Sequence, residues 1–160
     1  MLAVISRDER GYTVRYERHL KHPVEKVWAM LTENDKLAKW FSELSVDDLR
    51  VGSAIKFDMG NGSYEELEIL AMREREVLSY RWGGEDTVRF ELYPEPEGTR
   101  LVLIEKVKQL TDHTPKDLAG WHVCLDVVET LLDGRTFGSR KEAWQKLYGE
   151  YERAVGEIES

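Results

Sequence analysis

Three glutamates lie where strand periodicity could place a carboxyl group inside a folded core. Glu66 and Glu68 are two positions apart and share one face of a strand, while Glu105 continues the apolar face of another. A carboxyl group that a pocket desolvates has a raised pKa and can exchange a proton with a substrate. We expect Glu66 and Glu68 to be solvated, and Glu105 to be partly buried and paired with an arginine.

The histidines and the single cysteine give little support to metal or nucleophile chemistry. Neither the helical i, i+4 spacing nor the cysteine partners of a zinc site occur among His19, His22, His113 and His122. His122 precedes Asp126 by four residues, which favours a solvated pair on a helix. Cys124 lies on an apolar stripe without an evident cationic neighbour, so we expect a small buried hydrophobe. We expect no metal and no cofactor.

Aromatic side chains are the strongest candidates for binding. A pocket lined by aromatic rings could enclose an apolar molecule, although the same residues could simply fill a core. Tyr80, Trp82 and Phe90 form a sharper subset, because their strand segments should pair across Gly83 and Gly84 and form one wall. The full set of cavity candidates is Trp28, Trp40, Phe41, Phe57, Tyr80, Trp82, Phe90, Trp121 and Leu125.

Strands must position most of these residues. Segments 2–6 and 12–20 predict a hairpin in which Gly11 takes a positive φ. Six further segments alternate with period two and are separated by Gly, Pro, Asn and Ser turns, which predicts an antiparallel meander. These segments are 44–51, 54–59, 64–72, 77–83, 87–93 and 99–107.

Helices are predicted in two places. One helix should start at Pro23, and a second short helix should carry Leu37, Trp40 and Phe41. The long helix 114–134 should begin with Thr114 as N-cap and end at Gly134, and its Trp121 flank should be buried while its His122 flank faces water. A terminal helix over about 139–158 carries Trp144, Tyr148 and Tyr151, which could dock on the same chain or on a second copy, so a monomer or a homodimer is possible.

Composition narrows the class of protein. The 160 residues fit one domain over 1–160, with a core at about 10–134. The net charge of −8 disfavours nucleic acid and anionic membrane surfaces. One cysteine, no signal-peptide pattern and no apolar stretch of about 20 residues lead us to expect a cytoplasmic protein.

Three motifs in this order resemble a known family. Residues 23–32 (PVEKVWAMLT), 37–41 (LAKWF) and 120–134, which begin Gly-Trp and end Asp-Gly, resemble the SRPBCC superfamily, whose members are also called START-like or birch-pollen-allergen-like. The likeness is greatest to bacterial homologues of the activator of heat-shock-protein-ninety ATPase. It implies an α+β helix-grip fold, in which a curved antiparallel sheet wraps a long C-terminal helix, with two short helices after the first strand.

Function varies within that superfamily, so the fold leaves several functions open. Our main hypothesis is a non-enzymatic protein that binds a small apolar or amphipathic ligand between the sheet and the Trp121 helix. One alternative is a co-chaperone-like protein-interaction module whose acidic surface meets a chaperone or another protein. Another is a cyclase or hydrolase of aromatic substrates that uses Glu66, Glu105 or Tyr80 as acid or base.

Overall fold

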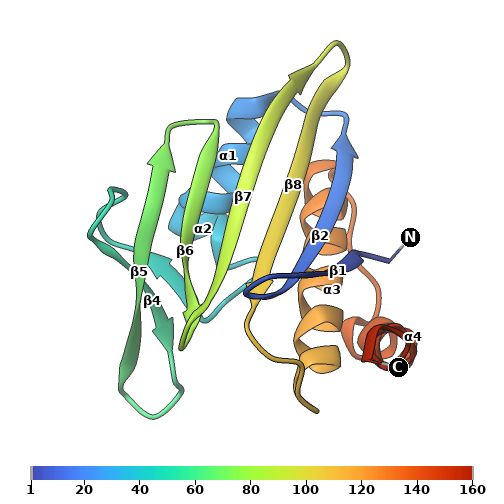
Figure 1. The fold of residues 1–160 in the computed structure, drawn as a ribbon. Coiled ribbons are helices and arrows are strands. Elements are labelled where there is room, and N and C mark those ends of the chain that lie inside the picture. The colour runs from blue at the N-terminus through green and yellow to red at the C-terminus, as the bar shows by residue number, and fades with distance from the viewer. Residues whose placement is uncertain (1, 160) are drawn as a thin grey trace.

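An eight-stranded antiparallel sheet dominates the computed structural model, which describes residues 2–159 (Figure 1). The strands are Val4–Asp8 (β1), Gly11–Leu20 (β2), Leu44–Val46 (β3), Ala54–Asp58 (β4), Tyr64–Arg73 (β5), Val77–Gly83 (β6), Asp86–Glu95 (β7) and Gly98–Val107 (β8). Their order in the sheet is β1-β2-β8-β7-β6-β5-β4-β3. The predicted meander is therefore confirmed, and the N-terminal hairpin closes onto its last strand.

Two close backbone contacts explain why glycine is needed at the ends of the central strands. Gly11 has φ 148°, and a Cβ there would lie 2.4 Å from the Val107 carbonyl oxygen. Gly98, at the start of β8, would place a Cβ 1.9 Å from the carbonyl oxygen of Leu20. Neither position has room for a side chain, so both glycines allow β2 and β8 to pair closely.

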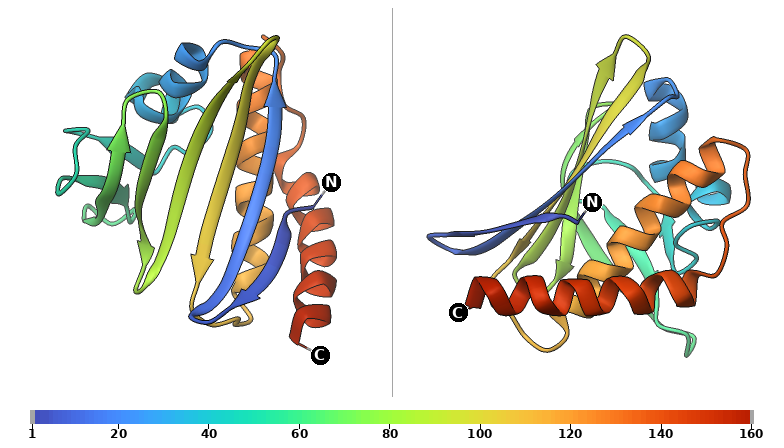
Figure 2. Two further views of the ribbon diagram at one scale, coloured as in Figure 1. Left: turned by 45° about the horizontal axis from the view of Figure 1, so that its top comes forward. Right: turned by 90° about the vertical axis from the view of Figure 1, so that its right-hand side faces the viewer.

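Four helices complete the fold, with bounds Val24–Thr32 (α1), Asn34–Leu37 (α2), Thr114–Leu132 (α3) and Arg140–Glu159 (α4). Figure 2 shows α3 packed across one face of the curved sheet and α4 crossing α3 on its outer side. The main core lies between the sheet and α3. The α+β helix-grip architecture expected from the sequence is confirmed.

Two predicted segments are shorter in the structure. Helix α2 ends at Leu37, so Trp40 and Phe41 lie in the irregular segment after it rather than on a helix. The indole nitrogen of Trp40 donates to the Met30 carbonyl at 2.7 Å, which anchors this segment against α1. Turn hydrogen bonds from Trp40 and Phe41 to the Leu37 carbonyl hold its backbone. The strand predicted over 44–51 ends at Val46, because residues 47–50 bend away from the sheet before the turn at Gly52, which has φ 89°.

The start of α3 also differs from the prediction. Thr114 does not cap the helix with its side chain; its hydroxyl accepts a hydrogen bond from the backbone N–H of Thr111 at 2.9 Å. The residue at the N-cap is His113, which makes no capping side-chain bond. Pro115 in the first turn and Gly134 at φ 72° bound the helix as predicted.

The prediction that His122 faces water on α3 is wrong. His122 is 6% exposed and lies against α4, where its Nδ1 is 2.7 Å from the hydroxyl oxygen of Tyr151. The sheet covers one side of α3 and α4 packs on the other, so His122 is buried, whereas Asp126 is partly exposed and Asp133 is exposed on the same flank. Tyr151, whose docking partner the sequence left open, packs within the same chain.

Candidate functional site

Aromatic rings converge where α3 meets the sheet. The ring centroids of Trp82 and Trp121 are 4.7 Å apart, and Phe41 and Phe90 lie 5.6 and 5.9 Å from Trp121. Strands β6 and β7 pair Leu78 with Phe90, which brings the predicted aromatic wall together. The result is a cluster of tilted and edge-to-face rings of a kind that stabilises cores.

Rings from β6 and β7 pack directly against Trp121 on its sheet side. Five of the nine cavity candidates, namely Trp28, Phe57, Tyr80, Phe90 and Leu125, belong to the core or pack against it and do not line the pocket beside Trp121. Tyr80 is 2% exposed, and burial raises the pKa of its hydroxyl well above the usual value. It is therefore held as a neutral phenol.

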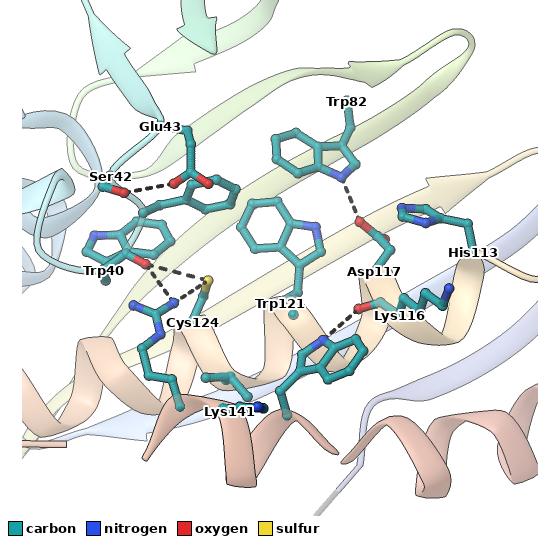
Figure 3. A pocket seen from close by; sticks show the side chains of 15 residues that line it. Trp40, Ser42, Glu43, Trp82, His113, Lys116, Asp117, Trp121, Cys124 and Lys141 are labelled. Atoms are coloured by element: carbon teal, nitrogen blue, oxygen red, sulfur yellow. Dashed lines mark hydrogen bonds between the residues drawn. The ribbon is translucent and has the colours of Figure 1, made fainter. Parts of the chain in front are cut away.

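A pocket of about 740 Å³ lies beside this cluster, at the outer edge of the sheet-to-helix contact (Figure 3). The other four candidates, Trp40, Phe41, Trp82 and Trp121, line it. Helix α3 contributes one wall, the segment after α2 another, and the first turns of α4 a third. The remaining lining residues are Ser42, Glu43, His113, Lys116, Asp117, Gly120, Val123, Cys124, Arg140, Lys141 and Trp144.

Gly120 leaves part of this volume free. It lies on α3 and lines the pocket, and a Cβ built on it would meet no atom within 4 Å. Any larger side chain there would extend into the pocket instead of into packed atoms. The Gly-Trp pair at 120–121 thus combines an absent side chain with the largest one.

Arg140 connects α4 to the pocket wall. Its guanidinium donates to the Trp40 carbonyl at 3.1 Å and lies 3.6 Å from the sulfur of Cys124. A cationic neighbour of this cysteine, not evident in the sequence, is therefore present. Burial nonetheless dominates and raises the pKa of the Cys124 thiol to about 11, so it stays protonated and unreactive at neutral pH.

Asp117 is the acidic group of the pocket wall. Figure 3 shows its carboxylate pointing toward Trp82, whose indole nitrogen donates to it at 2.9 Å. Asp117 lies one helical turn before Trp121, so the two side chains share a face of α3. Asp117 was not among the residues predicted for the site, and its i, i+4 spacing from Trp121 was the available signal.

Glu105 lies behind Asp117 and is buried. It is 1% exposed. The prediction of an arginine partner is wrong, because the charged groups that act on Glu105 are the acids Asp117 and Asp86. Burial, followed by the charge of Asp117 and a hydrogen bond to it, raises the pKa of Glu105 well above the usual range. Glu105 therefore keeps its proton and donates a hydrogen bond to the Asp117 carboxylate.

Two buried side-chain atoms among residues 2–159 have no hydrogen-bond partner. They are Oε1 of Glu105 and the indole Nε1 of Trp121. Such atoms are rare in folded proteins, since each loses its hydration without replacement. Both flank Asp117, on β8 and on α3.

The other two acids considered for catalysis do not line the pocket. Glu66 and Glu68 are exposed on β5, as expected, and Glu68 accepts from Arg81 at 3.0 Å. Within the described chain, no three His, Cys, Asp or Glu residues are grouped so as to hold a metal ion. The polar groups that could bind a ligand are therefore those around Asp117.

A family model described as Activator of Hsp90 ATPase homolog 1-like protein matches residues 21–133. The chain belongs to this family. The match runs from just before α1 to the end of α3, and it confirms the resemblance inferred from the three motifs. Helix α4, which supplies Arg140 and Trp144 to the pocket, lies outside the matched residues.

Solved structures share the fold of this family member. The conserved protein of unknown function EF2215 from Enterococcus faecalis has a TM-score of 0.86 at 23% identity, over 99% of this chain and 92% of its own. CalU16 from Micromonospora echinospora has a TM-score of 0.70 at 21% identity, over 96% of both chains. DynU16, from the dynemicin biosynthetic locus, has a TM-score of 0.66 at 25% identity, over 76% of this chain and 47% of its own. No curated protein matches the chain significantly.

The helices of this family member do not include a membrane span. Over residues 2–159, none is both long enough and apolar enough to cross a bilayer.

Proposed function

We propose that this member of the Activator of Hsp90 ATPase homolog 1-like family binds a small apolar or amphipathic molecule in the pocket beside Trp121. The observation that carries the proposal is a volume of about 740 Å³ walled by Trp40, Phe41, Trp82 and Trp121. Ligand pockets usually measure roughly 300 to 1,000 Å³ and combine aromatic walls with a few polar groups. This pocket has both features.

The family context supports the same function. Proteins of this family and its superfamily typically bind small hydrophobic ligands. DynU16 belongs to a locus for dynemicin biosynthesis, so the fold also occurs beside the production of a small molecule. For this chain, the ligand would rest on the four rings and expose its polar end to Asp117 or to the rim.

Gly120→Leu tests the proposal, because it fills the pocket without displacing packed atoms. The uncharged dye N-phenylnaphthylamine should bind the unchanged protein with increased emission, and Gly120→Leu should weaken this binding at least tenfold. Gly156→Leu is the matched control, since Gly156 lies on α4 with nothing within 4 Å of its Cβ position and outside the pocket. Both variants replace a helical glycine, so neither should lower the unfolding midpoint.

Two results would refute the proposal. One is that the unchanged protein binds neither this dye nor other uncharged aromatic probes. The other is that Gly120→Leu and Gly156→Leu bind the dye equally well. Native mass spectrometry of protein purified without detergent would add the mass of any molecule retained from the cell.

A further inference from the structure

The polar groups at one end of the pocket indicate which functional group the ligand has. Asp117 is the only carboxylate on the α3 wall of the pocket, and none of the ion pairs among residues 2–159 includes it. Its known partners are two donors, the indole of Trp82 and the acid of Glu105. A carboxylate has about four acceptor sites, so acceptor capacity is left over for a donor from a ligand.

A donor without an acceptor lies one helical turn away. The Nε1 of Trp121 is buried without a partner, and in Figure 3 this nitrogen lies on the side of the ring that faces Trp82 and Asp117. The side chain is 2% exposed and lines the pocket. A ligand that provides an acceptor here would recover the hydrogen bond that this group lacks.

We infer that the ligand is an aromatic molecule with a hydroxyl group, which donates to Asp117 and accepts from the indole of Trp121. The inference rests on the proposed function and deepens it. A hydroxyl group is both donor and acceptor on one atom, which is what two such groups on adjacent turns of α3 require. Its donation to a carboxylate is a short, charge-assisted bond.

Charges at the pocket rim do not favour an ionic ligand. The cations Lys116, Arg140 and Lys141 and the acid Glu43 are all exposed, so water and salt screen them. Arg140 is already bonded to the Trp40 carbonyl. The rim therefore selects neither sign of charge, whereas a ligand ammonium would lose its hydration among the aromatic walls and a ligand carboxylate would meet Asp117.

Three compounds with the same ring system test each bond separately: β-naphthol, its methyl ether and naphthalene. The ether retains the acceptor but not the donor, and naphthalene has neither. Calorimetry should show β-naphthol binding about tenfold more tightly than the ether, and the ether about fivefold more tightly than naphthalene. β-Naphthoate and naphthylmethylammonium, the ionic analogues, should bind more weakly than β-naphthol.

Two variants assign the bonds to residues. Asp117→Asn should reduce the advantage of β-naphthol over the ether, and Trp121→Phe should remove the advantage of the ether over naphthalene. Glu43→Gln and Trp144→Phe are the controls; both change pocket residues, but Glu43 is exposed and the Trp144 indole already donates to the Lys116 carbonyl. Circular dichroism and unfolding midpoints identify any variant that fails to fold, and the comparison of the three compounds on the unchanged protein does not depend on the variants.

Failure of this inference and failure of the proposed function give different results. If the three uncharged compounds bind within twofold of one another, or an ionic analogue binds more tightly than β-naphthol, the inference is overturned while the proposed function stands. If none of the compounds binds, the proposed function falls as well. If both advantages survive in Asp117→Asn and Trp121→Phe, the assignment to these two residues is wrong.

Discussion

The hydroxyl of Tyr151 on α4 lies 2.7 Å from Nδ1 of His122 on α3 and also accepts a hydrogen bond from the backbone N–H of Ala3 at 2.9 Å. One phenol thus joins the two C-terminal helices to the residue before β1. The other imidazole nitrogen of His122 is 3.6 Å from Asp126. Burial outweighs this carboxylate and lowers the pKa of His122 to about 4.

The depressed pKa of His122 predicts a stability that falls with acidification. Below the unfolded value of 6.5, the unfolded chain binds a proton that the folded chain refuses until about pH 4, so stability is complete above about 6.5 and is lost between 6.5 and 4. We expect the difference in unfolding free energy between about pH 7.5 and pH 5 to be about 1 to 2 kcal/mol larger for the unchanged protein than for His122→Gln. Urea titrations at both pH values measure it, and equal differences would contradict the prediction.

Tyr151→Phe should destabilise the protein at neutral pH. It leaves the Ala3 N–H and the His122 imidazole without a partner, which costs about 1 to 3 kcal/mol. Tyr148→Phe, on the same helix but with a more exposed hydroxyl, should change the free energy of unfolding by less than about 0.5 kcal/mol. Chemical unfolding at one pH compares the two variants, and similar losses for both would refute the role of the Tyr151 hydroxyl.

Gly98→Ala should be severely destabilising. Its Cβ would lie 1.9 Å from the Leu20 carbonyl oxygen, so β2 and β8 would have to separate at this point. We expect a loss of more than about 2 kcal/mol in unfolding free energy. Gly138→Ala is the control, because a Cβ there meets nothing within 4 Å, and it should be nearly neutral.

Trp82 and Asp117 should be energetically coupled. The indole donates to the carboxylate at 2.9 Å, so Trp82→Phe and Asp117→Ala remove the same hydrogen bond from its two ends. A double-mutant cycle in chemical unfolding should give a coupling energy of about 1 to 2 kcal/mol. Strict additivity would mean that the bond contributes nothing to stability.

Glu105→Gln should stabilise the protein at alkaline pH. The raised pKa means that folded Glu105 keeps a proton that the unfolded chain releases above about 4.5, so this contribution to stability is lost as pH rises. A glutamine amide donates to Asp117 without that penalty. We expect a gain of about 1 to 2 kcal/mol near pH 8 that disappears near pH 4.5, whereas the exposed Glu68→Gln should show no such trend.

Local patterns were sufficient to predict the sheet and α3. Glycine positions and period-two alternation mark the hairpins, and the pairing of Leu78 with Phe90 follows from them. The start of α3 was less predictable, because the hydroxyl of Thr114 can serve the helix or the preceding turn, and the structure uses it for Thr111.

Contacts of α4 could not be predicted in the same way. Amphipathic periodicity identifies an apolar face but not its partner, so nothing local placed Tyr151 on His122. The same reason hid the third wall of the pocket, to which Arg140 and Trp144 contribute. The burial of Glu105 was expected from the pattern of its strand. Its neighbour Asp117 was not, because that contact depends on how α3 is rotated against β8, and the pattern of one strand does not determine this rotation.

The bond between Ala3 and Tyr151 spans 148 positions, and its consequence concerns the order of events during synthesis. During synthesis β1 is complete before any of α4 is made, so the backbone N–H of Ala3 is without its phenol partner until Tyr151 has emerged. Domains generally complete their folding only when all of their elements are available. Helix α4, which is translated after β1 and α3, thus joins the residue before β1 to α3 and adds the third wall of the pocket, and nascent chains that stop before Tyr151 should be more accessible to proteases than chains that include it.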